Sequence, residues 1–141
     1  MRYLVATDGS REGDSAVEYA SRHAAALDAT LEIVHVLTPD TRLVDGELVL
    51  AGGSKAVELG ERTLEQARRL AADAVEAEPP DIDAELLSGR PAESITDHAR
   101  EAEADAIFVG HRGLSEEREQ VVGSVAKSVL DKATVPVTVI R

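Results

Sequence analysis

The feature that most constrains the fold of this 141-residue chain is the alternation of short apolar runs with longer segments of helical periodicity. Runs rich in β-branched residues that are bounded by Gly, Pro, Asp or Ser predict strands. The five predicted strands are 2–7, 30–37, 82–87, 106–109 and 136–140. Strands that alternate with helices imply βαβ units with right-handed crossovers. We therefore expect an α/β fold: a doubly wound, open five-stranded parallel sheet with helices on both faces, in one domain over residues 1–141.

Helical periodicity predicts four helices between these strands. They are expected to start at Asp14 or Ser15, to span 54–78 before Pro79 and Pro80, to start after Gly89 with Pro91, and to span 125–133. In the last helix Val125, Val129 and Leu130 are expected to face inward. The stretch 38–54 is irregular, and either a loop or one helical turn fits it.

The strand patterns also predict where a ligand would bind. Residues 82–87 alternate as an edge strand does, whereas 106–109 are uniformly apolar as in a central strand. In such sheets ligands bind beyond the carboxyl ends of the strands, where the strand order reverses. Asp8, Val36 and Gly110 all lie at predicted carboxyl ends, so we expect them to converge on one crevice.

Composition limits the class of protein. The formal net charge of −12 argues against a nucleic-acid partner, since phosphate contacts need an excess of Lys and Arg. The absence of cysteine excludes disulfides, and the absence of a long apolar run or signal-like start favours a cytoplasmic protein without a membrane segment. The chain has 27 Asp and Glu residues but only three lysines, which are Lys55, Lys127 and Lys132. This composition resembles that of proteins from salt-accumulating organisms. Molar salt would screen repulsion between this acidic chain and an anionic ligand.

A glycine pattern near the C-terminus predicts a phosphate site. Gly110 and Gly113 follow the fourth strand, and after nine residues Gly123 and Ser124 open the last helix. A strand, a glycine loop and a helix start offer backbone N–H groups to phosphates. Plain turn chemistry is the competing interpretation, but this connection is longer than such loops usually need. The pattern therefore favours a nucleotide site.

The same residues resemble the universal stress protein family, whose nucleotide-binding members share G-x2-G-x9-G-[ST]. Residues 110–124 match this spacing without a gap. The other segments that resemble the family are VATDGS with Ser15 downstream, the pair His35 and Val36, GRPAESI, ADAIFVG and VPVTVIR. The likeness covers nearly the whole chain apart from 38–78. It implies a Rossmann-like fold of the adenine nucleotide alpha hydrolase-like type.

The resemblance also implies a set of nucleotide-binding positions. They are Ala6, Thr7, Asp8, Val36, Gly110, Arg112, Gly113, Gly123, Ser124 and Val125. Asp8 and Val36 fall where the family holds the adenosine end, with Ala6 and Thr7 on the same wall. The glycines, Ser124 and Val125 fall where the loop and helix start wrap ribose and phosphates. Arg112 is the candidate for neutralising phosphate charge.

Several of these positions have a purely structural alternative. Asp8 is also suited to an Asx turn with its own backbone. His35 and His98 are expected to be structural, and His23 to be an exposed helix residue. His111 stands where the family usually has a small residue, which places a ring at the mouth of the site.

The loop between the glycines departs from the family as well. It carries Glu116, Glu117 and Glu119, where many members have hydrophobic or basic residues. These carboxylates would oppose a triphosphate unless they point outward, are screened, or bind through Mg²⁺. A solvated loop is the favoured interpretation in so acidic a chain.

These features favour a small stress-response protein that binds ATP or a related adenine nucleotide, with Mg²⁺ where the carboxylates require it, and acts as a nucleotide-dependent switch. Catalysis has little support beyond slow ATP hydrolysis or self-phosphorylation at Ser124 or Ser128. The alternative is a nucleotide-free, homodimeric interaction module of the same fold. A phosphoacceptor receiver domain ranks last, because only Asp8 fits its acidic cluster.

The last strand predicts the partner. Val137, Val139 and Ile140 would leave an exposed apolar edge, which natural proteins avoid. Family members commonly cover this edge with a second copy. The resemblance therefore implies a homodimer through Val137 to Ile140.

Overall fold

The computed structural model of the protein describes residues 1–38, 42–44, 47–49, 53–111 and 122–141. In chain order the elements are β1 (Arg2–Ala6), α1 (Arg11–Ala26), β2 (Thr30–Leu37), β3 (Arg42–Val44), β4 (Glu47–Val49), α2 (Ser54–Asp73), β5 (Ile82–Ser88), α3 (Pro91–Glu101), β6 (Ala106–Gly110), α4 (Ser124–Lys132) and β7 (Val137–Ile140). Within these described residues, no helix is long and apolar enough to cross a membrane.

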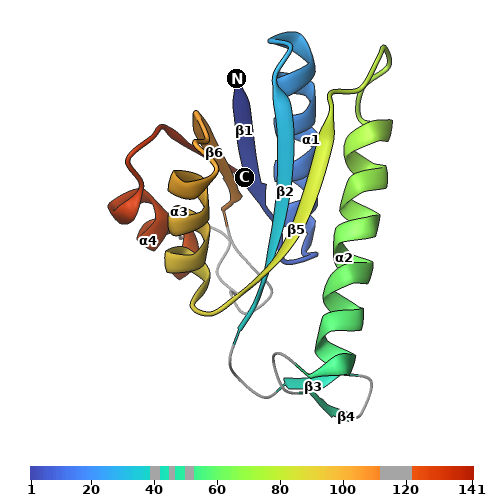
Figure 1. The fold of residues 1–141 in the computed structure, drawn as a ribbon, viewed down its shortest axis with the longest axis vertical. Helices are drawn as coiled ribbons and strands as arrows, with labels where there is room; N and C mark the ends of the chain where they lie inside the picture. Colours follow the sequence, from blue (N-terminus) through green and yellow to red (C-terminus); the bar gives the residue numbers. More distant parts are fainter. Residues whose placement is uncertain (39–41, 45–46, 50–52, 112–121) are drawn as a thin grey trace.

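The main sheet has five parallel strands in the order β5-β2-β1-β6-β7. Because every pairing is parallel, all five carboxyl ends point toward the same end of the sheet, and Figure 1 shows this common direction for β1, β2 and β5. This is the predicted doubly wound parallel sheet, and β5 is an edge strand while β6 is an inner one, as their patterns indicated. The strand order reverses between β1 and β6, because the chain continues from β1 outward to β2 and β5 and only later returns to β6 and β7.

Alternate side chains of the strands build two apolar layers, one on each face of the sheet. One layer includes Val5 and Ile33 and packs against α1 and α2. The other includes Leu4 and Val34 and packs against α3 and α4. Small and branched residues fill both layers, so the helices can approach the sheet closely. Both faces of the sheet are therefore covered, with the edges left at β5 and β7.

All the aromatic side chains of the chain gather on the α1 face. Tyr3, Tyr19 and Phe108 are its two tyrosines and its single phenylalanine. Tyr3 meets Phe108 edge to face, with ring centroids 5.5 Å apart, and the exposed His23 stacks on Tyr19 at 5.6 Å. His23 is thus an exposed helix residue, as predicted, and it also belongs to this aromatic cluster.

Two helix boundaries differ by more than one residue from the sequence predictions. The prediction that α1 starts at Asp14 or Ser15 is wrong, because Ser10 caps a helix that begins at Arg11. The Ser10 hydroxyl accepts a hydrogen bond from the Gly13 N–H, so the earlier serine satisfies the first turn. Helix α2 ends at Asp73, before the predicted end at 78, because its buried face ends at Ala71.

The predicted inner face of α4 is partly wrong. Val129 is fully buried, as expected, but Val125 and Leu130 are 40% and 48% exposed. Ala126 is buried in their place, because the pair 126 and 129 forms the stripe that faces the sheet.

The irregular stretch after β2 contains a small antiparallel sheet. Strands β3 and β4 pair with Leu43 opposite Leu48, where a loop or one helical turn was expected. The sequence carries Asp45 and Gly46 between the two strands, and Asp-Gly is a strong signal for a two-residue hairpin turn.

Candidate functional site

The candidate site lies at the carboxyl ends of β1 and β6, where the strand order reverses. Ala6 is the last residue of β1, and it pairs with Val34 of β2 on one side and with Val109 of β6 on the other. Gly110 ends β6. Ligands of open α/β sheets bind at such a reversal point. The sequence prediction that Asp8, Val36 and Gly110 lie at strand ends is confirmed.

Two hydrogen bonds tie the end of β1 to β2. The Thr7 N–H donates to the Val34 carbonyl at 3.0 Å. The Thr7 carbonyl accepts a bond from Nδ1 of His35 at 2.8 Å, so His35 carries its proton on Nδ1. Thr7 is buried and His35 half-buried. His35 therefore has the structural role predicted for it, which is to fix the backbone at the floor of the site.

Asp8 closes the turn between β1 and α1. Its Oδ1 accepts the Ser10 N–H at 3.0 Å, which is the Asx-turn arrangement. Gly9 adopts a φ of +83°, which glycine tolerates without a Cβ penalty, and its N–H donates to Thr7 Oγ1 at 3.1 Å. The structural alternative for Asp8 is thus observed, and the turn holds its carboxylate at the strand end.

Two glycines let the first turn of α1 lie directly against the strand ends. A Cβ on Gly13 would lie 2.6 Å from Thr7 Oγ1, and a Cβ on Gly110 would lie 2.8 Å from the Glu12 carbonyl carbon. The neighbour of Gly110 is backbone that cannot move aside, whereas the neighbour of Gly13 is the Thr7 hydroxyl, which is held by its bond from the Gly9 N–H. Sequence reasoning missed the cap formed by Ser10 and the close approach at Gly13. The available signal was Ser10 itself, since Ser is a preferred residue immediately before a helix.

The start of α4 is fixed beside the end of β6. The Gly123 N–H donates to the His111 carbonyl at 2.7 Å, and the His111 N–H donates to the Ile140 carbonyl at 2.6 Å. Gly123 is buried at the N-cap, while Ser124 and Val125 are exposed in the first turn. The structure thus brings the first and last glycines of the predicted motif to one place. Arg112, Gly113 and the acidic loop with Glu116, Glu117 and Glu119 lie outside the described residues.

The His111 ring is buried next to this connection. Its residue is only 4% exposed, and its Nε2 has no hydrogen-bond partner among the described residues. The ring that the sequence places at the mouth of the site is therefore buried in the structure. A buried polar atom without a partner is uncommon in folded proteins.

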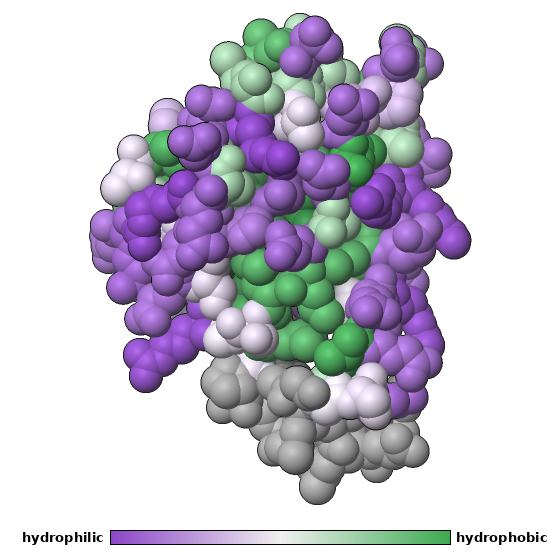
Figure 2. Space-filling view, viewed as in Figure 1, coloured by the Kyte–Doolittle hydropathy of each residue, from purple (hydrophilic) through white to green (hydrophobic). Residues whose placement is uncertain are grey.

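An apolar wall adjoins the polar turns. Val36 pairs in register with Leu87 of β5, and both belong to the layer under α3 and α4 together with Ala6 and Val122. Figure 2 shows an apolar area over the lower parts of β2 and β5, between α3 and α2. The strand ends thus join an apolar surface to the polar groups of Thr7 and Asp8.

The first turn of α1 carries an unfavourable charge. Burial raises the pKa of Asp14 above its usual value, and repulsion from Glu18 and Asp8 adds to this shift. Asp14 and Asp8 thus place two carboxylates near the strand end. This local field opposes an anionic ligand unless a cation or a backbone N–H group compensates for it.

A sequence model of the universal stress protein family matches residues 1–141. The chain belongs to this family. A Thermus aquaticus relative, described as "universal stress protein in QAH/OAS sulfhydrylase 3′region", is 35% identical over 139 residues, which cover 98% of this chain and 96% of the relative. The predicted family resemblance is confirmed.

Solved family members share the fold. A universal stress protein in complex with cAMP has a TM-score of 0.77 and 24% identity, and the match covers 100% of this chain and 97% of the other. A universal stress protein from Archaeoglobus fulgidus in complex with dAMP has a TM-score of 0.76 and 24% identity, with 100% of this chain and 98% of the other covered. Both adenine nucleotides were bound by proteins of this architecture.

Proposed function

We propose that this protein binds an adenine nucleotide at the carboxyl ends of β1, β2 and β6 and acts as a nucleotide-dependent switch in a stress response. The observation that carries the proposal is the bond between the Gly123 N–H and the His111 carbonyl. It holds the N-terminus of α4 beside the end of β6, next to the point where the strand order reverses. The family's cAMP and dAMP complexes support an adenine nucleotide as the ligand.

The residues fit the parts of such a nucleotide. The half-buried Val36 and Ala6 offer an apolar wall to adenine, with Thr7 and Asp8 beside it. The first turn of α4 presents its backbone N–H groups at a helix N-terminus, where the helix dipole favours a phosphate. The orphaned Nε2 of His111 would gain a partner from a phosphate or ribose oxygen.

We propose ATP as the ligand, with Mg²⁺ compensating for the acidic surroundings. Asp8 and Asp14 near the site and the glutamates of the glycine loop would otherwise repel the phosphates. Arg112 is the proposed cationic contact from this chain. A protein with a net charge of −12 needs such compensation or high salt.

The test is equilibrium binding of ATP with Mg²⁺ in molar KCl, measured by calorimetry on the full chain and on a matched pair of variants. Gly123→Asp and Gly123→Asn both place a preferred N-cap residue at the start of α4. Only Asp adds a charge, so it should weaken binding at least about tenfold more than Asn does. Absence of saturable binding by the unmodified protein, with ATP and with AMP, would reject the proposal.

A second candidate function, a homodimeric interaction module, is favoured by the outer edge of β7. The Ile107 N–H bonds to the Pro136 carbonyl at 2.9 Å, and the His111 N–H to that of Ile140. Alternate residues of a parallel strand point their peptide groups to opposite sides, so those of Val137 and Val139 are directed away from β6. This edge is suited to pairing with the same strand of a second copy.

Sedimentation equilibrium tests the dimer. Val139→Pro removes the outward N–H without removing a bond to β6, and should convert a two-chain particle into a monomer. Val139→Thr keeps the N–H and should remain dimeric. An unmodified protein that sediments as a monomer at all concentrations would contradict the interaction-module candidate, whatever its nucleotide affinity.

A further inference from the structure

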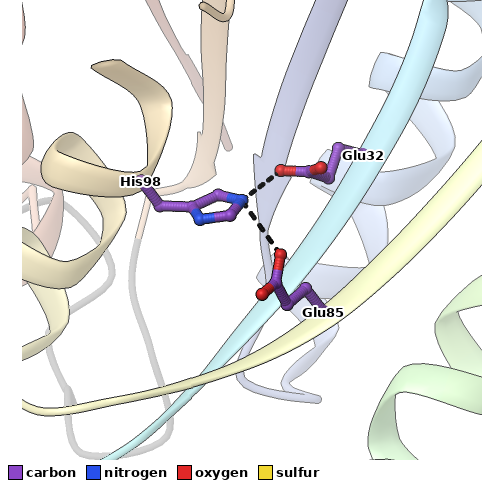
Figure 3. Close-up of side chains that lie close together, drawn as sticks. All are labelled: Glu32, Glu85 and His98. Atoms are coloured by element: carbon purple, nitrogen blue, oxygen red, sulfur yellow. Dashed lines mark hydrogen bonds and ion pairs between the residues drawn. The ribbon is translucent and has the colours of Figure 1, made fainter. Parts of the chain in front are cut away.

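A cluster of ionisable side chains lies on the α3 face of the sheet, away from the candidate nucleotide site. Nε2 of His98 on α3 contacts Oε1 of Glu32 on β2 and lies 3.4 Å from Oε2 of Glu85 on β5 (Figure 3). One ligand-type atom from each residue lies within 4.8 Å of the others. Three different elements therefore direct one nitrogen and two oxygens toward a common point.

Glu32 is the unusual member of this cluster. It is only 7% exposed in an inner strand, with the apolar Leu4 as its register partner on β1. A buried carboxylate is costly unless charged or hydrogen-bonding groups surround it. Its Oε2 accepts a bond from Nη1 of Arg2 at 3.1 Å, which fixes the carboxylate and leaves Oε1 directed at His98. This arrangement resembles the way that ligating carboxylates are held by an outer hydrogen bond.

The local charge favours a divalent cation. Glu32, Glu85 and Asp83 bring three carboxylates to this face, and Arg2, which also contacts Asp83 at 3.2 Å, brings one guanidinium. With a neutral imidazole the group carries two excess negative charges. A divalent ion would balance them, whereas protonation of His98 balances only one.

The spacing is suited to direct coordination. Metal–ligand bonds of about 2.0–2.1 Å in a tetrahedron place donor atoms about 3.3 Å apart. His98 Nε2 and Glu85 Oε2 are 3.4 Å apart, which already meets this condition. His98 Nε2 and Glu32 Oε1 are closer, so their separation would increase when an ion binds between them. The Glu85 side chain is 56% exposed, which gives the ion a path from solvent and leaves room for water as a further ligand.

We propose that Glu32, Glu85 and His98 form a binding site for a divalent transition-metal ion that links α3 to β2 and β5. Imidazole and carboxylate together suit Zn²⁺ better than Mg²⁺ or Ca²⁺, which prefer oxygen ligands alone. The site is separate from the proposed nucleotide crevice, since Glu32 lies near the start of β2 and Val36 near its end.

The test is a titration of the chelator-treated full chain with Zn²⁺, without nucleotide, followed by calorimetry. Parallel titration with Co²⁺ reports imidazole and carboxylate ligation through its visible absorption. We expect saturable binding of one ion per chain and a Co²⁺ spectrum that Zn²⁺ abolishes. His98→Ala and Glu85→Gln should each weaken Zn²⁺ binding at least about tenfold.

The controls distinguish zinc binding at this site from zinc binding at another histidine, and from an ion-pair cluster that binds no metal. His23→Ala removes an exposed imidazole of α1 and should leave the affinity unchanged. Glu85→Gln changes an exposed side chain, so it keeps the test informative where His98→Ala disturbs packing. Absence of saturable Zn²⁺ binding, or equal affinity of the unmodified protein and Glu85→Gln, would overturn the proposal and leave His98 as the cation of an ion-pair cluster. ATP binding is measured separately, so its loss or presence does not decide this result.

Discussion

The Gly123 N–H and the His111 carbonyl, joined by a 2.7 Å hydrogen bond, fix the two ends of the glycine loop to each other. The start of α4 is therefore set by the backbone of the residue that follows β6. The His111 side chain is not needed for this bond, because only its carbonyl takes part. Backbone and ring of His111 can thus be tested independently.

Replacement of the ring leads to the first prediction. His111→Leu keeps the backbone bond and substitutes an apolar side chain for a buried imidazole whose Nε2 has no partner in the described part of the chain. An unsatisfied buried polar group costs about 1–3 kcal/mol, so the nucleotide-free variant should be as stable as the parent protein or more stable by up to that amount. Denaturant unfolding in molar KCl measures this difference. A variant less stable by 2 kcal/mol or so would show that the ring already has a partner.

The close approach of Gly110 to α1 leads to the second prediction. Gly110→Ala would place a Cβ 2.8 Å from the Glu12 carbonyl carbon. This carbon belongs to the backbone of α1, so it cannot rotate away from the new methyl group as a side chain could. We expect a loss of about 1–3 kcal/mol in the free energy of unfolding. Gly60→Ala is the matched control, because its Cβ would meet the Leu86 Cδ1 at 2.7 Å, which is the end of a flexible side chain.

The Gly60→Ala variant also gains helix propensity of about 1 kcal/mol, which offsets part of its strain. It should therefore be closer to the parent protein in stability than Gly110→Ala is. Equal losses for the two variants would contradict the distinction between backbone and side-chain contacts.

The N-cap of α1 leads to the third prediction. The Ser10 hydroxyl is buried and accepts the Gly13 N–H at 3.1 Å. Ser10→Ala removes this acceptor and should cost about 0.5–2 kcal/mol of stability. Ser10→Thr keeps a hydroxyl at the same position and should lose less. The comparison is made by denaturant unfolding, and equal stability of Ser10→Ala and the parent protein would refute the assigned cap.

The sequence predicted the sheet and its strand ends well, because those features depend on apolar runs and turn residues that are contiguous in the chain. It failed where the decision depended on packing. The inner face of α4 was assigned to the larger Val125, but the sheet accepts the smaller Ala126. In α1 the serine at position 10 was the effective cap although Asp14 and Ser15 offered similar chemistry.

The ion cluster of Glu32, Glu85 and His98 illustrates a different limit. Each residue is unremarkable in its own segment, and His98 was expected only to be structural. The parallel register of β2 and β5 and the position of α3 bring them together. The three residues lie in separate segments of the chain, and no spacing between neighbouring residues indicates that they meet. Sequence patterns alone could therefore not have identified the cluster.

The raised pKa of Asp14 leads to the last prediction, which concerns pH. Burial, with Glu18 and Asp8, raises the pKa in the folded state above the 3.8 of the unfolded chain. The folded protein therefore binds a proton more tightly, and stability falls as pH rises from that value through the raised pKa. Asp14→Asn removes the charge, so it should be more stable than the parent protein at neutral pH, with the advantage shrinking as the carboxyl becomes protonated in acid. Denaturant unfolding between about pH 3 and pH 7 measures this, with Asp131→Asn on the exposed side of α4 as the control for net charge. An advantage of Asp14→Asn that is the same at every pH would show that it arises from packing and not from the ionised carboxylate.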